Sequence, residues 1–197
     1  GHRAAIQAAK IGKRTAIIEH KGVVGGACIN TGTIPSKTLR EAVMHLSGYN
    51  QRGIYGQAYR VKQKIVMADL LHRTDHVIRN EIDVTQHQLM RNSVEVITAA
   101  GSFVDEHTVR LKDGGNGGHR DVTADKIVIS VGTTCTRDEH IPFDGERIFI
   151  SDDLLTLKTL PKKLAVIGAG VIGCEYATIF AALGVRVTVI DKRSRLL

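Results

Sequence analysis

Apolar residues recur at helical spacing over two stretches in the first half of the chain. The first pattern begins near Ser36 and the second runs from about Met67 to Met90, so each stretch is predicted to form a helix. The residues that carry the two patterns are Leu39, Ala42, Val43 and Leu46, and then Leu70, Leu71, Ile78, Ile82 and Leu89.

Three runs after these helices are rich in β-branched residues and predict strands. They are Val94 to Ile97, Phe103 to Leu111 and Val122 to Val131, and the turn sequence DGGNGG at 113–118 joins the last two. Farther on, the sequence SDDLL predicts a helix with Ser151 as its N-cap, because a serine hydroxyl accepts a hydrogen bond from the first turn. We expect a domain boundary there, between residues 1–150 and residues 151–197.

The hydrophobic pattern is sharpest in the stretch KLAVIGAGVIGCEYATIFAALGVRVTVID at 163–191. An apolar strand from Leu164 to Ile167 leads into a helical pattern that ends at Gly184. A second strand follows from Val185 to Ile190, and the stretch closes on Asp191. The order strand, helix, strand predicts a parallel βαβ unit.

Three glycines of this unit, Gly168, Gly170 and Gly173, form the sequence G-x-G-x-x-G. The first permits a tight turn, the second lets the backbone approach a pyrophosphate, and the third lets helix and strand pack closely. The N-terminus of the helix attracts the phosphate charge, and Asp191 is suited to accept hydrogen bonds from a ribose. The unit therefore predicts a dinucleotide-binding site.

The beginning of the chain repeats the later part of this unit. A shift of 172 residues aligns the helix patterns, and it places VRVTVI on KRTAII. The matched pairs are Gly173 with Gly1, Ala177 with Ala5, Gly184 with Gly12, Arg186 with Arg14, and Asp191 with Glu19. We therefore expect an internal piece of a longer protein, which starts inside one dinucleotide unit and stops just after the second strand of another.

Composition and charge narrow the classes of function. The net charge of +7 is compatible with nucleic-acid binding, but the basic residues are scattered, aromatic residues are 4%, and no recognition motif occurs. Cys28, Cys135 and Cys174 fit neither a disulfide framework nor a zinc spacing, and the nine histidines lack metal-ligand spacing. No apolar run approaches the ~20 residues of a membrane helix. We expect a cytoplasmic protein with no metal, no nucleic-acid partner and no membrane partner.

Three segments together resemble the two-dinucleotide flavoprotein reductases, the family of glutathione reductase, lipoamide dehydrogenase and mercuric reductase. They are GGACINTGTIPSK at 25–37, IVISVG at 127–132 and GAGVIGCEYA at 168–177. The resemblance implies an α/β fold in which a doubly wound FAD-binding domain with a small antiparallel insertion precedes the start of a Rossmann-type NAD(P)-binding domain. It also implies a homodimer or other homo-oligomer, assembled through a C-terminal domain that is absent from this chain.

The resemblance assigns the first dinucleotide unit and its neighbours to FAD. Glu19 would bind the adenosine ribose, the segment that follows it would run along the cofactor, and 130–132 would return the chain to the flavin. The residues implied to contact FAD are Gly1, Glu19, His20, Lys21, Gly25, Gly26, Ala27, Cys28, Gly32, Thr33, Lys37, Gly101, Ser130, Val131 and Gly132.

The second unit would bind the nicotinamide dinucleotides NAD(H) and NADP(H) as substrates. Its implied contact residues are Gly168, Gly170, Val171, Ile172, Gly173, Glu175, Asp191, Lys192 and Arg193. Lys37 and Glu175 match the family's catalytic lysine beside the flavin and the acid that pairs with it. Without the resemblance, both would be interpreted as ordinary first-turn residues of helices. Lys192 and Arg193 follow the acid directly, so we expect the site to accept both dinucleotides.

One position departs from the reductases and directs the functional hypothesis. Thr33 stands where the second cysteine of the loop C-x-x-x-x-C would lie, so Cys28 has no partner in the loop. Threonine at this position resembles the transhydrogenase branch of the family, which implies FAD-dependent hydride transfer between NADPH and NAD⁺. Two alternatives stay open: a dithiol or metal reductase with thiols outside this chain, and a flavoprotein that senses nucleotides without turnover.

Overall fold

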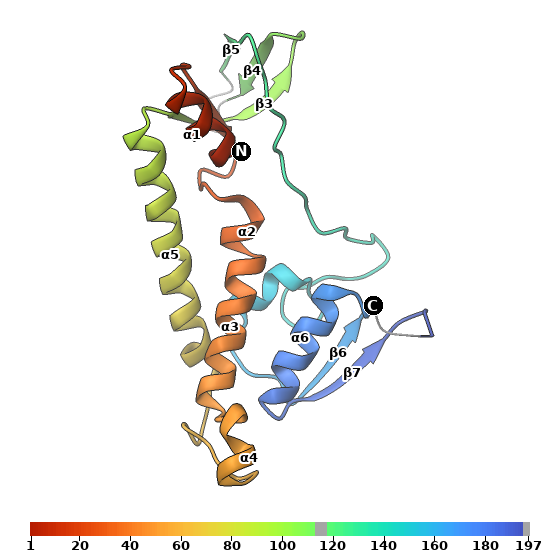
Figure 1. The fold of residues 1–197 in the computed structure, drawn as a ribbon. Coiled ribbons are helices and arrows are strands. Elements are labelled where there is room, and N and C mark those ends of the chain that lie inside the picture. Colours follow the sequence, from red (N-terminus) through yellow and green to blue (C-terminus); the bar gives the residue numbers. More distant parts are fainter. Residues whose placement is uncertain (113–117, 195–197) are drawn as a thin grey trace. The chain divides into compact units, whose positions relative to one another are not determined.

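The computed structural model describes residues 1–112 and 118–194 (Figure 1). It divides the chain into two compact units: unit 1 holds residues 1–27 and 79–133, and unit 2 holds residues 28–78 and 134–197. The elements are α1 (His2–Lys10), β1 (Ala16–Glu19), α2 (Gly26–Asn30), α3 (Thr33–Leu46), η1 (Tyr49–Gln51), α4 (Arg52–Tyr55), α5 (Met67–Arg91), β2 (Glu95–Thr98), β3 (Ala100–Phe103), β4 (Thr108–Lys112), β5 (His119–Thr123), η2 (Ser151–Thr156), β6 (Lys163–Ile167), α6 (Val171–Ala182) and β7 (Arg186–Ile190).

Unit 1 combines a parallel strand pair with a small antiparallel sheet. β1 lies parallel to β2, with Ala16 opposite Glu95. Strands β3, β4 and β5 form an antiparallel meander in that order, as the predicted insertion requires. One core cluster packs Ile6 of α1 against Leu89 and Val94, and a second gathers around Leu111 of β4. The mixed parallel and antiparallel arrangement confirms this part of the predicted fold.

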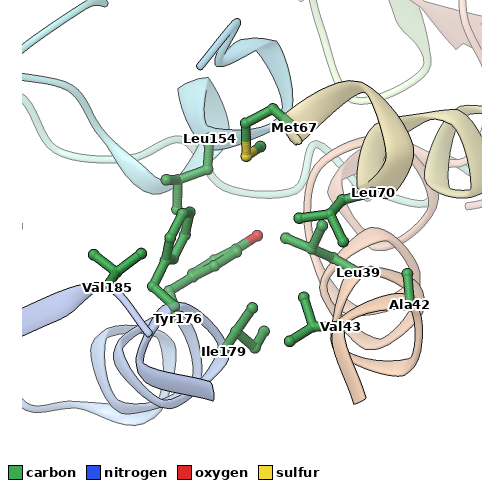
Figure 2. Close-up of a cluster of buried hydrophobic side chains, with 10 residues drawn as sticks. Leu39, Ala42, Val43, Met67, Leu70, Leu154, Tyr176, Ile179 and Val185 are labelled. Carbon is green, nitrogen blue, oxygen red and sulfur yellow. The ribbon is translucent and has the colours of Figure 1, made fainter. Parts of the chain in front are cut away.

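Unit 2 contains a βαβ unit with two further helices packed on it. β6 and β7 are parallel, with Lys163 opposite Arg186, and α6 connects them. The core of this unit is built from apolar side chains of α3, α6, η2 and the first turn of α5 (Figure 2). Phe180 and Leu39 are its largest fully buried members. The core therefore fixes α3 against α6.

The predicted elements agree with the structure for the repeated units and the long helix. The helix from Met67 ends at Arg91, one residue beyond the prediction, and the strand near Val94 runs over Glu95–Thr98. Gly12 and Gly184 follow α1 and α6 with φ of 80° and 85°, a left-handed conformation that suits a glycine after a helix. The domain bounds 1–150 and 151–197 stay a prediction.

The predicted start of the first helix at Ser36 is wrong by three residues. α3 begins at Thr33, and Pro35 and Ser36 are buried in its first turn. A proline is compatible with this turn because its missing N–H would have no partner within the helix. The side chain of Ser36 donates to the carbonyl of Thr33 at 3.3 Å. The apolar pattern alone did not register this polar first turn.

Two strand predictions are also wrong in extent. The run from Phe103 to Leu111 is divided by a turn, in which Asp105 accepts a hydrogen bond from the backbone N–H of His107 at 2.8 Å. The run from Val122 to Val131 forms a strand only as far as Thr123. No strand of the described residues pairs with 125–131, so this backbone has no ladder partners there. The turn predicted at 113–118 falls largely on residues outside those described.

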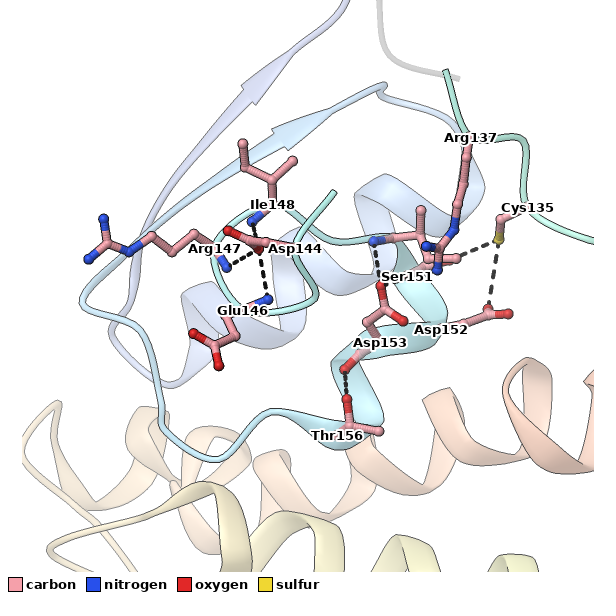
Figure 3. Close-up of polar contacts among 11 residues, drawn as sticks. Cys135, Arg137, Asp144, Glu146, Arg147, Ile148, Ser151, Asp152, Asp153 and Thr156 are labelled. Atoms are coloured by element: carbon pink, nitrogen blue, oxygen red, sulfur yellow. Dashed lines mark hydrogen bonds and ion pairs between the residues drawn. The ribbon is translucent and has the colours of Figure 1, made fainter. Parts of the chain in front are cut away.

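Ser151 is not an N-cap, in contrast to the prediction. It is the first residue of the 3₁₀ helix η2, and the residue before it is Ile150. Asp153 closes the start of this helix by accepting a hydrogen bond from the backbone N–H of Ile150 at 3.1 Å (Figure 3). The bond at this helix start thus runs from the residue before the helix to a carboxylate in its first turn, and not from the first turn to a hydroxyl.

Candidate functional site

The loop between β6 and α6 brings two backbone segments into unusually close contact. Gly168 has φ of 100°, a conformation open mainly to glycine. A Cβ atom on Gly173 would lie 2.0 Å from the carbonyl oxygen of Gly168, which is closer than any side chain can approach. Both glycines are therefore required by the geometry of the protein itself. This is the compact turn that a pyrophosphate-binding loop needs.

The first turn of α6 is open to solvent. Gly170 precedes the helix, and no side chain caps the turn. Val171 is 71% exposed and Ile172 is also exposed, so neither residue covers this end of the helix. The uncapped N–H groups and the positive end of the helix dipole favour an anion at this position. Val171 is also not aromatic, so this position has no ring that could lie over a bound dinucleotide.

Asp191 lies at the end of β7 and is held by several donors. Its carboxylate accepts hydrogen bonds from the backbone N–H of Ala169 at 2.6 Å and from that of Arg193 at 2.8 Å. The Arg193 guanidinium adds a two-pronged contact, with Nε and Nη2 each 3.1 Å from a carboxylate oxygen. Arg193 and these backbone donors hold the pKa of Asp191 far below its usual range. The pair therefore presents a carboxylate and a guanidinium together beside the glycine loop.

Lys37 and Glu175 are brought together from positions 138 residues apart in the sequence. The Nζ atom of Lys37, on α3, lies 2.5 Å from Oε1 of Glu175, on α6. The lysine side chain is 60% exposed, whereas the glutamate side chain is only 16% exposed. The glutamate is thus the fixed member of the pair, and it holds an accessible ammonium group at the start of α3.

Cys28 lies in α2 and Thr33 is the first residue of α3. Cys28 is exposed, and all three cysteines of the chain are free. Cys174 donates its thiol hydrogen to the carbonyl of Ala169 at 3.3 Å. Cys135 contacts Ser151 and Asp152 at 3.7 and 3.8 Å (Figure 3). None of these thiols is placed to complete a disulfide with another.

In unit 1, the predicted ribose-binding acid lies at the end of a strand. Glu19 closes β1, and its carboxylate accepts a hydrogen bond from the backbone N–H of Lys21 at 2.9 Å. The Nδ1 atom of His20 lies 3.6 Å from the same carboxylate. His20 and Lys21 are exposed, and Gly25 and Gly26 follow with positive φ of 105° and 59°, before Ala27. An acid at a strand end followed by a bare glycine loop fits a dinucleotide.

The structure also brings Gly1 beside Ser130, although they are far apart in the sequence. A Cβ atom on Gly1 would meet the Ser130 side chain at 3.5 Å. Val131 is 87% exposed, and Gly132 has φ of 71°. Gly101 has a different surrounding, because a Cβ atom there would lie 3.3 Å from Val109 and 3.5 Å from Ile18. Packing within unit 1 thus accounts for the glycine at 101 without a ligand.

The predicted residues fall into two groups, one in each unit. Within unit 2 the structure joins Lys37 to Glu175 and Asp191 to Arg193. Cys28 lies on α2, Gly32 precedes α3 and Thr33 begins it. Lys192 is the exposed residue between Asp191 and Arg193. The described residues contain no group of three or more His, Cys, Asp or Glu side chains able to hold a metal ion. Their longest helices are also not apolar enough to cross a membrane.

Sequence reasoning missed Tyr176, which follows Glu175 on α6. Its ring is only 5% exposed, and its hydroxyl is buried without a hydrogen-bond partner in the described parts of the chain. Figure 2 shows this hydroxyl among the apolar side chains of the unit 2 core. Burial raises the pKa of Tyr176 from 10.0 to about 12, and the negative charges of Glu175 and Asp152 add to the rise. A tyrosine in an otherwise apolar helical pattern was the available signal.

The whole chain is similar to proteins of known class. Residues 1–197 match the family described as pyridine nucleotide-disulphide oxidoreductase. A protein of Mycobacterium bovis BCG named soluble pyridine nucleotide transhydrogenase is 53% identical over the entire chain, and the match covers 42% of that relative. The chain thus spans about two fifths of the length of the curated relatives it matches.

Two solved structures have the same fold. LpdA from Mycobacterium tuberculosis superposes with a TM-score of 0.83 at 24% identity, and the match covers 98% of this chain and 42% of the other. The flavoprotein disulfide reductase RclA from Escherichia coli has a TM-score of 0.79 at 28% identity, with 100% of this chain and 40% of the other covered. Both comparisons support the α/β arrangement described above.

Proposed function

Because the chain belongs to the pyridine nucleotide-disulphide oxidoreductase family, we propose that it is part of an FAD-dependent transhydrogenase that moves hydride from NADPH to NAD⁺. The 53% identity to a protein named soluble pyridine nucleotide transhydrogenase supports this activity. The observation that carries the proposal is the Lys37–Glu175 ion pair between α3 and α6, together with Thr33 at the position of the second thiol.

The cofactor and the substrates are assigned to different glycine loops. We assign FAD to the unit 1 residues around Glu19, Gly25 and Gly26, together with Cys28, Gly32, Thr33 and Lys37. We assign the nicotinamide dinucleotide to the loop at Gly168–Gly173 and to Asp191. The close approach of Gly173 to Gly168 and the uncapped first turn of α6 support the second assignment.

Bound FAD would supply a ring that accepts a hydride from one nicotinamide and passes it to another. Lys37 would then stabilise the negative charge that accompanies reduction, since a fixed ammonium group acts where charge develops. Glu175 keeps that ammonium in one position and would lower the cost of removing it from water when a bound dinucleotide covers it. In these roles Lys37 is the catalytic residue beside the flavin. Glu175 holds Lys37 in place and would itself contact the nicotinamide.

A dithiol relay is absent from the proposed reaction. Disulfide exchange passes through a mixed disulfide that a second thiol must resolve, and Thr33 has no thiol. The hydroxyl of Thr33 is a weak nucleophile unless a strong base activates it, so it cannot take the place of a resolving thiol. The loop would thus be retained for position: it would follow the cofactor and place Lys37.

The second site is proposed to accept both NAD(H) and NADP(H). Asp191 suits the 2′-hydroxyl of NAD(H) and repels a 2′-phosphate, by up to about 4 kcal/mol at ~4 Å and an effective dielectric of ~20. Arg193 is bound to that carboxylate, so it already offsets part of the negative charge. Lys192 adds a second cation next to it. We also infer a cytoplasmic location, in keeping with the free cysteines, and a homo-oligomer, which rests on the family resemblance alone.

The test is a direct assay, without coupling enzymes, on the intact, FAD-loaded protein. NADPH and thio-NAD⁺ are added, and no thiol is present. Formation of thio-NADH is expected. Turnover only after a disulfide or a metal ion is added would instead support a dithiol or metal reductase. Slow reduction of the bound FAD without turnover would support a nucleotide-sensing flavoprotein. Either of these two results would contradict the proposed transhydrogenation.

A further inference from the structure

Unit 2 contains a cavity of about 240 Å³ at the ends of two of its helices. α3 ends at Leu46 and α6 ends at Ala182, and residues adjoining both ends line the cavity. The lining residues are Ser47, Arg52, Arg60, Lys62, Gln63, Lys64, Ile65, Leu160, Ala182 and Leu183. Most of the polar residues come from one segment, 47–64, which carries three of the four tyrosines of the chain.

Local packing fixes this segment against the end of α3. Gly48 has φ of 63°, and the ring of Tyr59 lies where a side chain at Gly48 would be, with Cδ1 2.6 Å from the position of a Cβ atom. The backbone N–H of Lys62 donates to the carbonyl of Leu46 at 3.0 Å. The basic residues of the cavity are therefore held on an ordered backbone.

The cavity carries more positive charge than its surroundings neutralise. Arg52, Arg60, Lys62 and Lys64 are four cations, and only Lys62 has a carboxylate partner among the described residues, Asp69 at 2.7 Å. The ends of α3 and α6 add about half a negative charge each. The excess is therefore roughly two positive charges, which is more than stabilising two helix ends requires.

Arg52 is fixed by a hydrogen bond and by an aromatic ring. Its Nη2 atom donates to the carbonyl of Ser47 at 3.1 Å, and its guanidinium lies 5.2 Å from the centre of the Tyr49 ring. Its Nε atom is buried and has no acceptor in the described parts of the chain. A buried N–H without a partner costs about 1–3 kcal/mol, and the other donors of this guanidinium are those of its two terminal nitrogens.

We propose that this cavity is a binding site for a phosphate group, either free or carried by a nucleotide. Guanidinium groups present the forked donors that match phosphate oxygens, and lysines add charge. The volume of about 240 Å³ lies below the usual range for a whole drug-sized ligand, roughly 300–1,000 Å³. The phosphate group of such a ligand would occupy the cavity, with any remaining part outside it.

The cavity is separate from the proposed dinucleotide site. Lys37 lies nine residues before Leu46 on α3, which corresponds to about 14 Å along a helix. The glycine loop adjoins the first residue of α6, whereas the cavity adjoins its last, at a distance of about 18 Å for this helix. A phosphate bound at the cavity would therefore leave the nicotinamide site free.

Calorimetric titration of the intact protein tests the proposal. The protein is loaded with FAD and saturated with NADH, so that both proposed nucleotide sites are filled. Inorganic phosphate, pyrophosphate and ATP are then titrated at constant ionic strength, with chloride as the reference anion. We expect saturable binding of pyrophosphate. Similar affinities for pyrophosphate and ATP would assign recognition to the phosphate alone, and at least tenfold tighter ATP binding would add a contribution of the base.

Variants distinguish this site from general attraction by a basic protein. Lys64 forms no hydrogen bond or ion pair that would be lost from the described structure, so Lys64→Gln should keep the melting temperature and weaken pyrophosphate binding at least threefold. Arg60→Gln together with Lys64→Gln should weaken it at least tenfold. Lys158→Gln is the matched control, since Lys158 is an exposed lysine of unit 2 outside the cavity. Equal losses in the control, or no binding to the loaded protein, would overturn the proposal.

Discussion

The two copies of the repeated βα unit share a backbone and differ in what their side chains do. In both, a helix ends at a left-handed glycine, Gly12 or Gly184, and a strand follows. In both, the acid that ends the strand accepts a hydrogen bond from the backbone N–H two residues later, at 2.9 Å for Glu19 and 2.8 Å for Asp191. The local turn is therefore set by the repeated sequence pattern.

The charges around the two acids are different. Arg193 reaches back to Asp191 with two hydrogen bonds, whereas Lys21 at the matching position of the first copy bonds to Glu19 only through its backbone. The second copy also has Glu175 paired with Lys37, where the first copy has the exposed Arg3. Only the second copy thus pairs its acid with a guanidinium and its helix with a lysine of α3.

The two helices also differ in burial. α1 buries only Ile6, whereas α6 buries Tyr176, Ala177, Ile179 and Phe180. Tyr176 stands where the first copy has Ala4. The large side chains of α6 bring it against α3, and this packing is what places Glu175 beside Lys37. One backbone motif therefore takes different partners in its two copies because the helix faces carry different side chains.

The largest effect is expected from Gly173→Ala, which breaks the second copy alone. A Cβ atom would lie 2.0 Å from the Gly168 carbonyl, so the loop must shift. We expect the dissociation constants for NADH and NADPH to rise roughly 100-fold and unfolding to become easier by about 1–3 kcal/mol. FAD should stay bound. The control is Gly53→Ala, where nothing lies within 4 Å of the new atom. Unchanged NADH binding by Gly173→Ala would contradict the close-packed loop.

Lys37→Ala tests whether the pair unique to the second copy serves the reaction. We expect the rate of NADPH-to-NAD⁺ transfer to fall about 10- to 100-fold, which corresponds to roughly 1.4–2.7 kcal/mol of lost stabilisation. The measurement is the steady-state rate with thio-NAD⁺ together with the FAD content. Arg40→Ala on the same helix removes an exposed cation as a control and should leave the rate within twofold. A wild-type rate in Lys37→Ala would remove the lysine from the proposed reaction.

Replacement of Lys192 and Arg193 by alanine tests the role of the cations beside Asp191. Glu19 has no guanidinium contact among the described residues. Without the guanidinium, Asp191 would repel the 2′-phosphate in full. We expect the dissociation constant for NADPH to rise about tenfold or more, while that for NADH changes less than threefold. Fluorescence titration of both dinucleotides gives the comparison. Equal losses for the two dinucleotides would show that the pair does not discriminate between them.

Tyr176→Phe tests the difference in burial and has the smallest expected effect on stability. It removes a buried hydroxyl without a partner, so the free energy of unfolding should rise by about 1 kcal/mol. The pKa of Tyr176 is raised in the folded protein to about 12, so wild-type stability should fall as the pH rises from 10 to 12. The variant should lose less stability over this range. Identical alkaline denaturation curves would contradict this account of Tyr176.

The features that the sequence predicted best are those fixed by local pattern. The glycine loop, both βα repeats and the long helix have their causes within short segments, such as the spacing of Gly168, Gly170 and Gly173. The Lys37–Glu175 pair also agrees with the sequence-based hypothesis, although the hypothesis came from resemblance. Nothing in the spacing of two residues 138 apart would have predicted a 2.5 Å contact.

The features that the sequence did not predict depend on contacts between distant segments. A segment rich in β-branched residues such as 127–131 has strand composition, but a strand also needs a neighbouring strand to pair with. The cavity around Arg52 arises because 47–64 folds against the ends of two helices, one of them more than 100 residues away in the sequence. The buried hydroxyl of Tyr176 likewise depends on which face of α6 meets α3. Periodicity contains no information on such pairings.

The central claim is that hydride passes between nicotinamides without a thiol step, and Cys28→Ser tests it most directly. Cys28 is exposed and free, so a serine there causes no packing change. The intact variant, with its FAD content verified, is assayed with NADPH and thio-NAD⁺ beside the wild-type protein. Our account predicts a rate within about threefold of wild type, because a threefold change is only ~0.65 kcal/mol in the barrier. Loss of turnover with FAD still bound would contradict it.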